Sequence, residues 1–395
     1  MKKVAIVQKA LAQYRVEFHN LLKGRLEEED IELTLIYSKY KTADALKKDE
    51  VDLVWGTCVP GKVITLGPLQ LLWQSCLPLL RDNDLVIVEQ ANKNLLNYLL
   101  LVKRAFSKIK FAYWGHGANR QINQTDLRNK FKKIFLNQCD WWFAYTGNVK
   151  KFLIINGYPS NRITNVQNAI DTKFLSKTYS QIGEAEVRKK LTERNITSRN
   201  VAIYCGGIYK EKRISFLISS CQRIRKQIPD FELIVIGAGP DASLLEQAVS
   251  ENNWIHYLGP RFGAEKITWF KASKVFLMPG LVGLAILDSF ALQTPMVTTD
   301  FPFHSPEIEY LENGINGIIT DNDETAYADA VINLLKDDRR QETLIKGCID
   351  SATRYSIEQM VENFAQGILK CLGQKSIKEP ITTTSRDTSL LLTQD

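Results

Sequence analysis

The sequence predicts an α/β fold with two parallel β-sheets, each covered by helices on both faces. Short, continuously apolar segments alternate with longer segments of helical spacing, as in a parallel sheet whose strands are buried on both faces. This alternation stops at a polar stretch from about Thr172 to Arg199, which we interpret as an inter-domain connection, and then resumes. In the second series, strands end in glycines. We therefore expect two separate sheets, one from residues up to about Leu175 and one from Val201 to Leu335.

In the first series, each apolar run is short enough to be a strand, and the segments between runs have helical spacing. The predicted strands are Val4–Gln8, Ile31–Tyr37, Leu85–Glu89, Lys110–Trp114 and Trp141–Ala144, and the predicted helices are Val16–Glu28 and Leu95–Phe106.

The second series repeats the alternation with its own strand ends. Its predicted strands are Val201–Cys205, Phe231–Ile236, Ile255–Leu258, Val275–Met278 and Met296–Thr299, and its predicted helices are Phe216–Gln227, Leu244–Asn252 and Leu284–Leu292. Two helices are expected after Thr325, over Tyr327–Leu335 and Ile357–Cys371. The expected domains are 1–175 and 176–355, followed by a last helix over 356–373 and a Ser/Thr-rich, disordered tail over 374–395.

The composition is that of an ordinary globular protein, with 45% hydrophobic and 24% charged residues. The apolar stretches Leu69–Leu80 and Leu95–Val102 are shorter than a membrane-spanning helix requires, and the first residues lack the apolar core of a signal peptide. The seven cysteines include no Cys-x-x-Cys pair, which favours a reducing compartment. We expect a cytoplasmic protein. Its net charge of +7 is compatible with an anionic ligand or an anionic membrane surface, and no nucleic-acid partner is expected.

No single motif of the second series is specific, but the order and spacing of several motifs together are. They are a glycine-containing strand end followed by a Glu-Lys pair, a Gly-x-Gly-Pro turn, a Tyr-Leu-Gly segment, a strand with its proline, an acid-bearing helix and a Thr-Pro-x-Val strand. In this chain they are Gly206–Arg213, Gly237–Pro240, Tyr257–Gly259, Val275–Pro279, Gly280–Asp288 and Thr294–Val297, and upstream lies Asn168–Thr172. This series resembles the family 4 retaining glycosyltransferases of the GT-B fold over roughly Tyr204–Phe364.

The resemblance implies two Rossmann-like domains whose parallel sheets face a central cleft. The N-terminal domain would bind the acceptor, the C-terminal domain would bind a UDP- or GDP-sugar, and the last helix would cross back onto the N-terminal domain. The sugar would pass with retention of configuration to a hydroxyl of a glycan, glycolipid or small molecule, as in polysaccharide or glycoconjugate synthesis. No enzymic nucleophile is evident, so the departing phosphate would accept the acceptor's proton. No metal or other cofactor is expected, because the nucleotide-sugar is a substrate.

Three positions depart from the family pattern. The first signature glutamate, which approaches the donor sugar in the family, is Gly280 here, and the second, which binds the ribose, is the shorter Asp288. The arginine of the first strand-end loop is replaced by Gly207, whereas the phosphate-binding lysine is kept as Lys212. These departures identify a divergent branch.

Elementary chemistry supports a donor site at the same residues. A diphosphate needs backbone N–H groups, a helix start and one or two cations. Gly283 and Leu284 open a predicted helix, Lys212 is a mobile cation, and the carboxylate of Asp288 can accept from ribose hydroxyls. In isolation, Asp288 and Lys212 read as solvated surface residues, but the ordered pattern favours binding. The predicted nucleotide-sugar-binding residues are Gly206, Gly207, Lys212, Arg213, Gly237, Gly280, Gly283, Leu284 and Asp288, with Lys212 also catalytic.

The first half offers candidates at predicted strand ends, where open α/β sheets bind ligands. His116 lies between two glycines after a strand and is a catalytic candidate that would face the donor sugar, as in the family. A hydrogen-bonded loop histidine is the alternative. Glu89 and Gln90 end another strand and are candidates for binding acceptor hydroxyls, although an ordinary structural role is equally compatible. Arg15 could contact a phosphate or an anionic acceptor, but a surface arginine is the simpler interpretation.

Other patterns carry less weight. Asp82-Asn83-Asp84 has the form of a metal-diphosphate motif, but it precedes a strand, where Asp and Asn are ordinary turn residues, so no metal site is expected. The segment 128–136 is basic and amphipathic, and 103–108 adds charge nearby. Such a helix can lie on an anionic membrane, or it can simply pack Phe131 and Phe135 inward.

Two alternatives to transfer remain open. A related GT-B enzyme could epimerise or hydrolyse a sugar nucleotide. A non-catalytic sugar-nucleotide-binding protein is also conceivable, because Gly280 and Gly207 replace side chains that contact the donor in the family.

Overall fold

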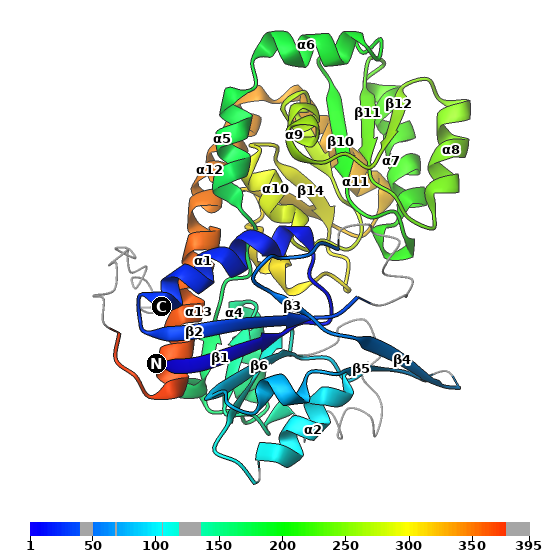
Figure 1. Ribbon diagram of the computed structural model, residues 1–395. Helices are drawn as coiled ribbons and strands as arrows, with labels where there is room; N and C mark the ends of the chain where they lie inside the picture. Colours follow the sequence, from blue (N-terminus) through cyan, green and yellow to red (C-terminus); the bar gives the residue numbers. More distant parts are fainter. Residues whose placement is uncertain (40–49, 68, 105, 118–135, 377–395) are drawn as a thin grey trace, which may run out of the picture.

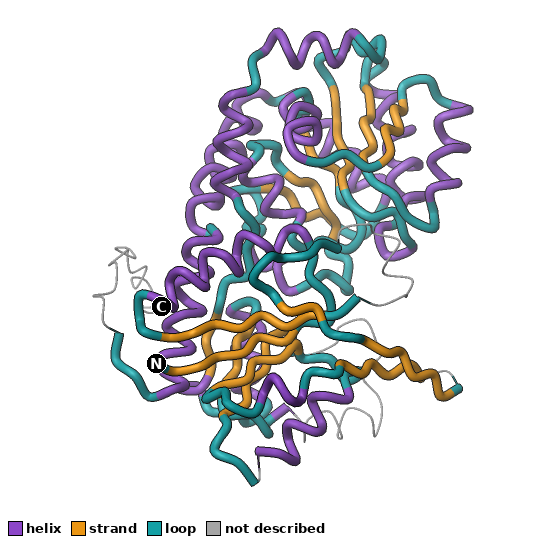
Figure 2. Tube along the Cα trace, in the orientation of Figure 1, coloured by secondary structure: helices purple, strands orange, loops and turns teal. Residues whose placement is uncertain are grey.

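The computed structural model describes residues 1–39, 50–67, 69–104, 106–117 and 136–376. The chain forms two α/β halves, one above the other in Figure 1, each around its own parallel sheet. Figure 2 shows the strands at the centre of each half and the helices outside them. Within the described residues no strand pairing joins the two sheets, so the predicted fold class of two Rossmann-like halves is confirmed.

The N-terminal sheet has seven parallel strands in the order β3-β2-β1-β6-β7-β8-β9. Its central strands are buried on both faces, which explains their continuously apolar sequence. The chain continues from β1 to one side and later returns to its other side, so the strand order reverses between β1 and β6. The strands are β1 (Lys2–Val7), β2 (Ile31–Tyr37), β3 (Thr57–Cys58), β6 (Leu85–Glu89), β7 (Lys110–Gly115), β8 (Trp141–Ala144) and β9 (Ile163–Asn165).

Helices cover this sheet, and one hairpin leaves it. The described helices are α1 (Val16–Glu27), α2 (Leu95–Arg104) and α4 (Gly147–Ile155), with short 3-10 turns η1 (Gln13–Arg15), η3 (Leu77–Leu80) and η4 (Ser160–Arg162). The antiparallel strands β4 (Gly61–Leu66) and β5 (Leu69–Gln74) form a hairpin that extends away from the sheet in Figure 1. The sequence did not predict this hairpin. The predicted basic helix 128–136 falls, except for Leu136, outside the described residues.

The C-terminal sheet has six parallel strands in the order β12-β11-β10-β13-β14-β15. This is the 3-2-1-4-5-6 order of the classical dinucleotide-binding sheet, with its reversal between β10 and β13. The strands are β10 (Val201–Cys205), β11 (Glu232–Ile236), β12 (Ile255–Gly259), β13 (Val275–Leu277), β14 (Met296–Thr299) and β15 (Gly317–Thr320), and the helices are α7 (Ile214–Gln227), α8 (Ala242–Glu251), α9 (Gly263–Lys271), α10 (Ala285–Ala291) and α11 (Glu324–Lys336), with η5 (Lys210–Lys212) and η6 (Pro306–Tyr310).

The polar connection and the end of the chain contain more helix than expected. The connection forms α5 (Thr172–Gln181) and α6 (Glu184–Thr192). After α11 a helix that we did not predict, α12 (Asp338–Arg354), precedes α13 (Ile357–Leu372). The α13 helix lies against the N-terminal half: the ring of Phe364 stacks on Phe143 at a centroid distance of 4.2 Å, and Glu362 accepts a hydrogen bond from Arg25 at 2.8 Å. Of the predicted tail 374–395, residues 374–376 are described and 377–395 lie outside the described residues.

The two halves meet at the carboxyl ends of their strands. The carboxylate of Glu309, in η6 after β14, accepts hydrogen bonds of 2.7 Å from the backbone N–H groups of Gly147 and Asn148, which begin α4 after β8. The hydroxyl of Tyr310 donates to the carbonyl of Asn168 at 3.2 Å. Because η6 belongs to the C-terminal half and α4 to the N-terminal half, a carboxylate of one domain caps a helix of the other.

Candidate functional site

The reversal of strand order in the C-terminal sheet brings two loops together. Open α/β sheets bind ligands at the carboxyl ends of the strands where this order reverses. Here the loop after β10 carries Gly206, Gly207 and Lys212, and the loop after β13 carries Gly280. The structure therefore places four of the predicted donor-site residues at the position that the fold favours for a ligand.

Lys212 is bound to the neighbouring loop rather than extended into solvent. Its side chain is buried, with the residue 6% exposed, and its ammonium donates to the carbonyl of Leu281 at 2.5 Å. The Sδ atom of Met278 lies 3.7 Å from the same nitrogen. In this conformation the lysine connects the β10 loop to the β13 loop.

Gly280 lies under the backbone of the β10 loop. A Cβ atom at this position would lie 2.3 Å from the carbonyl oxygen of Glu211 and 2.7 Å from the carbonyl carbon of Lys212. The N–H of the next residue, Leu281, donates to the same Glu211 carbonyl at 2.9 Å. Only glycine leaves room for this contact, so the missing family glutamate coincides with close packing of two backbones.

The same physical reason applies to the Gly-x-Gly-Pro turn after β11. A Cβ atom on Gly237 would lie 1.9 Å from the carbonyl oxygen of Gly206, and one on Gly239 would lie 2.0 Å from that of Ile208. The turn glycines thus allow the β11 and β10 loops to touch. A direct contact of Gly237 with a nucleotide stays a prediction.

A buried histidine that the sequence did not single out holds the segment before Gly283. The Nδ1 atom of His304 accepts from the N–H of Val282 at 2.9 Å, and its Nε2 atom lies 2.9 Å from the carbonyl of Thr299. These partners require the neutral tautomer with the proton on Nε2. The ring thereby fixes the segment that leads to Gly283 and Leu284, just before α10.

Asp288, in the first turn of α10, forms an ion pair. Its Oδ1 atom accepts from the ammonium of Lys266, on α9, at 2.8 Å. Burial acts to lower the pKa of Lys266, but the nearby carboxylate of Asp288 and the thiol of Cys205 outweigh it, so the pKa is raised. Burial raises the pKa of Cys205 to about 12, against the opposing charges of Lys266 and Lys212. Lys266 was not among the predicted residues.

Arg213 points away from this pair. Its backbone is left-handed, with φ of 58°, and its guanidinium donates to the carbonyl of Pro279 at 3.3 Å and to the side chain of Asn322. The guanidinium also lies 4.0 Å from the ring centroid of Phe216. These contacts connect the ends of β10, β13 and β15, so Arg213 holds the three strand ends together. Its role in phosphate binding stays a prediction.

In the N-terminal domain, predicted residues gather around Tyr145, which follows β8 and which the sequence did not indicate. His116, after β7, is exposed, and its ring lies edge-on to Tyr145 at a centroid distance of 4.4 Å. Gly117 has φ of 69°, so the chain turns sharply behind the histidine. Burial raises the pKa of Tyr145, while Arg15 lowers it and Glu89 raises it.

Arg15 is not the surface arginine that seemed the simpler interpretation. It is 4% exposed, and its Nη2 atom donates to Asn168 at 2.6 Å. Its guanidinium lies 5.0 Å from the ring centroid of Trp114. Asn168 in turn donates to Glu307 of the C-terminal domain. Arg15 thus joins an inter-domain chain of contacts, and its acceptor-binding role stays a prediction.

Glu89 ends β6, Gln90 follows it, and both residues are partly buried. One carboxylate oxygen of Glu89 accepts from the N–H of Lys9 at 3.3 Å, and Gln90 donates its N–H to the carbonyl of Trp114 at 2.9 Å. Gln90 also lines a small pocket with Asn97. Their acceptor-binding role stays a prediction.

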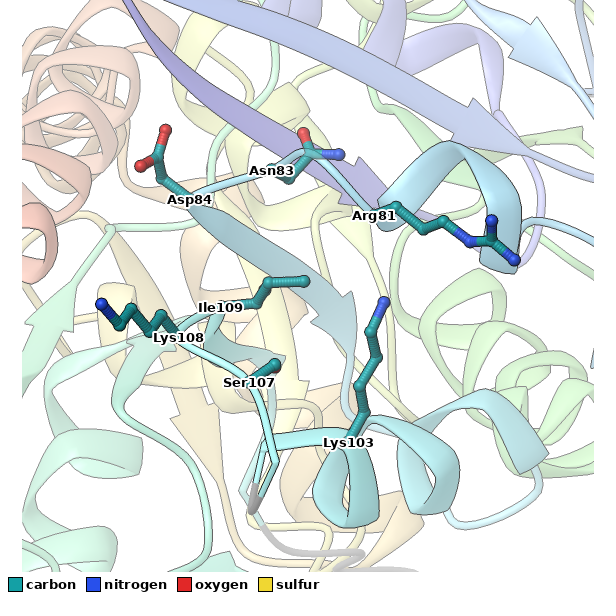
Figure 3. A pocket seen from close by; sticks show the side chains of 7 residues that line it. All are labelled: Arg81, Asn83, Asp84, Lys103, Ser107, Lys108 and Ile109. Carbon is teal, nitrogen blue, oxygen red and sulfur yellow. The ribbon is translucent and has the colours of Figure 1, made fainter.

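A larger pocket lies at the opposite edge of the N-terminal sheet, where β6 and β7 begin. Figure 3 shows side chains of the turn between η3 and β6, of α2 and of the loop before β7 around it. Asp84, from the Asp-Asn-Asp turn, accepts from the ammonium of Lys2 at 2.7 Å and from the N–H of Lys3. Within the described residues no group of three His, Cys, Asp or Glu side chains is placed to hold a metal ion. The pocket is lined by Arg81, Asn83, Asp84, Lys103, Ser107, Lys108 and Ile109.

Comparison with known sequences supports the assignment of the C-terminal half. Residues 199–337 match the family model described as glycosyl transferases group 1. A phosphatidyl-myo-inositol mannosyltransferase of Mycobacterium leprae is 24% identical over 155 residues, which cover 38% of this chain and 41% of the relative. An alpha-monoglucosyldiacylglycerol synthase of Acholeplasma laidlawii is 28% identical over 206 residues, or 50% of each chain. The chain thus spans about half or less of the length of these relatives.

Comparison with solved structures extends the similarity to both halves. The Anabaena protein Alr3699/HepE, solved in complex with UDP, superposes with a TM-score of 0.68 at 14% identity, covering 93% of this chain and 99% of that one. A likeness at this identity shows the fold. Together with the family match, it confirms the resemblance that the motifs indicate: residues 199–337 are similar to the glycosyl transferases group 1, and the chain has a GT-B fold.

Proposed function

We propose that the protein is a retaining glycosyltransferase that moves a sugar from a UDP- or GDP-sugar to an acceptor hydroxyl. One observation carries this proposal. The strand reversal of the C-terminal sheet gathers the β10 loop with Lys212, the β13 loop with Gly280 and the ion-paired Asp288. A helix start, cations and a carboxylate are the groups that a diphosphate and a ribose require.

The relatives support both substrates of this reaction. One relative is a phosphatidyl-myo-inositol mannosyltransferase and another an alpha-monoglucosyldiacylglycerol synthase, and the Anabaena neighbour was solved in complex with UDP. We therefore propose UDP as the first nucleotide to test, and a glycolipid or glycan hydroxyl as the acceptor class. The N-terminal domain would hold the acceptor near His116, which is exposed at the end of β7.

The chemistry that the resemblance implies requires little of the side chains beyond position and charge. The leaving diphosphate would accept the proton of the acceptor hydroxyl, so no enzymic nucleophile is needed. The N–H groups of Gly283 and Leu284, in front of α10, would stabilise the charge that develops on this diphosphate. Lys212 would contribute to the same stabilisation, directly or by holding Leu281 in place. We propose that the transfer needs no metal ion.

We also propose that the N-terminal domain contacts an anionic membrane surface. Val102 and Phe106, in and just after α2, are 62% and 87% exposed. The cations Arg81, Lys103 and Lys108 line the pocket beside them (Figure 3). Apolar side chains next to lysines suit the boundary between headgroups and acyl chains. No described helix is long and apolar enough to cross a bilayer.

This contact is tested by co-sedimentation with vesicles of neutral lipid, with and without an anionic lipid. Binding to anionic vesicles should weaken with salt and in the variant Phe106→Ser. Leu244→Ser is the matched control, because Leu244 is also exposed, at 38%, but lies on α8 of the other domain. Equal binding of both vesicle types would contradict the proposal.

The transfer activity is tested by incubating the protein with UDP- and GDP-sugars and a panel of lipid and glycan acceptors. An acceptor-dependent release of nucleotide with formation of a glycosylated product is expected, and the anomeric configuration of the product decides retention. Nucleotide release without acceptor would indicate hydrolysis, and a changed sugar would indicate epimerisation. Donor binding without turnover would favour the binding-protein alternative, which the packed Gly280 keeps open.

A further inference from the structure

The ion pair between Lys266 and Asp288 is an unusual feature for a purely structural contact. Its two side chains are 19% and 15% exposed, so they are shielded from water and still reachable from outside. Sheltered pairs gain little stability, since desolvation of the charges offsets their attraction. Lys266 also lies in the first turn of α9, where the helix dipole disfavours a cation. Stability alone therefore does not account for this lysine.

The pair leaves hydrogen-bonding groups available in the described part of the chain. Only Oδ1 of Asp288 accepts from Lys266, and within the described residues no hydrogen bond is found to Oδ2. The ammonium of Lys266 has three N–H groups and uses one of them for this bond. A ligand that approached the exposed edge would meet one acceptor and one donor side by side.

A vicinal diol matches this combination better than a phosphate does. One hydroxyl can donate to Oδ2 of Asp288 while the oxygen of the neighbouring hydroxyl accepts from Lys266. A phosphate oxygen would instead meet the carboxylate beside the ammonium, and like charges repel. The pair as a whole is neutral, as is a diol.

We propose that Lys266 is a second ribose-binding residue, which contacts one hydroxyl of the donor nucleotide while Asp288 contacts the other. The inference rests on the proposed function, because it concerns the nucleotide of the same site. It specifies that each of the two side chains binds a different hydroxyl of the ribose.

The test compares the affinities of three nucleotides: UDP, 2′-deoxy-UDP and 3′-deoxy-UDP. Calorimetry on the parent protein should show weaker binding of both deoxy analogues. In Lys266→Met the affinity for UDP should fall between about tenfold and a hundredfold, the range for a lost hydrogen bond to a charged group. The affinity for one deoxy analogue should stay unchanged, because that analogue already lacks the hydroxyl in question.

The matched control is Lys271→Met on the same helix. The ammonium of Lys271 donates to the carbonyls of Tyr179 and Ile182, at 2.8 and 2.7 Å, and faces the α5–α6 connection. Its replacement should leave the discrimination between the three nucleotides unchanged. Lys266→Arg, which keeps a charged donor, should restore part of the lost discrimination.

A structural role would give a different result. If Lys266→Met weakened binding of all three nucleotides by the same factor, or of none, the inference would be overturned. If Lys266→Met does not fold, the same comparison is made with Lys266→Gln, a shorter neutral donor, and uniform loss again overturns it. A parent protein that binds neither UDP nor GDP overturns the proposed function itself, whereas a parent that binds UDP with equal affinities for all analogues overturns only this inference.

Discussion

Restoring the family glutamate at Gly280 should damage the protein rather than improve it. The resemblance alone would suggest that Gly280→Glu regains a contact with the donor sugar. In the structure, any side chain at this position meets backbone: a Cβ atom would lie 2.3 Å from the carbonyl oxygen of Glu211 and 2.8 Å from the Cα of Lys212. Backbone atoms cannot rotate away as the end of a side chain can, so the two loops must separate.

The cost can be worked out from the contacts that separation breaks. Forcing extra atoms into a packed site costs about 1–3 kcal/mol. Displacing the β10 loop also breaks the hydrogen bond from the N–H of Leu281 to Glu211, worth about 1 kcal/mol. A loss of roughly 2–4 kcal/mol should lower the melting temperature of a domain of this size by roughly 5–15 °C. Gly280→Ala should show most of this loss, because the clash already involves Cβ.

The assay is thermal unfolding of Gly280→Ala, Gly280→Glu and a control glycine in the same loop. In Gly283→Ala the new Cβ would come no closer than 3.4 Å to the hydroxyl of Ser305, an ordinary contact, so its melting temperature should stay near that of the parent. A melting temperature of Gly280→Ala equal to that of the parent would contradict this prediction. So would a Gly280→Glu protein that folds normally and transfers sugar faster than the parent.

Four further predictions concern the site, the domain boundary and the core. Lys212→Ala should lower the single-turnover transfer rate about a hundredfold, and more than it weakens donor binding; transfer at the parent rate would show that Lys212 does not stabilise the charge on the leaving diphosphate. Asp288→Ala should weaken UDP binding by about 1–3 kcal/mol in calorimetry, and unchanged affinity would contradict its ribose role. Glu309→Gln should cost about 1 kcal/mol in urea unfolding, because the cap on α4 loses its charge; an unchanged midpoint would argue against a stabilising cap. Burial, with a smaller contribution from Arg15, lowers the pKa of His19 from 6.5 to about 3. Above pH 6.5 the histidine is neutral in both states and costs no stability; between pH 6.5 and 3 the unfolded state takes up a proton first, so stability falls with the pH. Stability should drop by about 2 kcal/mol from pH 7 to pH 5, a drop that His19→Gln should not show.

The parallel sheets could be predicted because their strands are buried on both faces. A strand such as β10, with residues 201–204 fully enclosed, must be apolar at every position and stands out from its polar neighbours. The shorter edge strands β9 and β15 each have partly exposed residues, and the sequence did not indicate them. Their pairing depends on the sheet beside them, which local sequence does not describe.

The helices and the hairpin that the sequence did not indicate are largely polar or exposed, unlike the buried strands. The α12 helix is mostly polar, because only a narrow stripe with Leu344 and Cys348 is buried. The α5 and α6 helices are likewise largely exposed, and the polar connection therefore read as a loop. In the β4–β5 hairpin most described side chains are at least partly exposed. The apolar run that begins at Leu69 therefore did not indicate a hairpin. Such elements depend on tertiary contacts more than on their own pattern.

For the candidate site, the positions of the glycines were predictable and the partners of the charged residues were not. Lys212 and Leu281 are 69 residues apart, and Lys266 and Asp288 are 22 apart, so no local pattern connects them. His304 and Tyr145 belong to none of the motifs, and only the fold shows that His304 holds Val282 and that Tyr145 meets His116. A sequence reading can therefore identify which loops form the site, but not which side chains are already engaged within it.

One departure from the family pattern, Gly280, has a physical reason in this packing. Gly237, Gly239 and Gly280 each admit a backbone carbonyl within 2.3 Å of where a Cβ would stand, so these glycines are needed to stack the three strand-end loops. At Gly280 the β10 backbone occupies the space into which a glutamate would extend. The absence of that glutamate therefore reflects how the loops are stacked, and by itself it is no evidence that the donor site has been lost. If the stacked loops still bind a nucleotide, contacts to the donor sugar must come from other groups, and the exposed His116 of the facing domain is the candidate that the structure leaves in place.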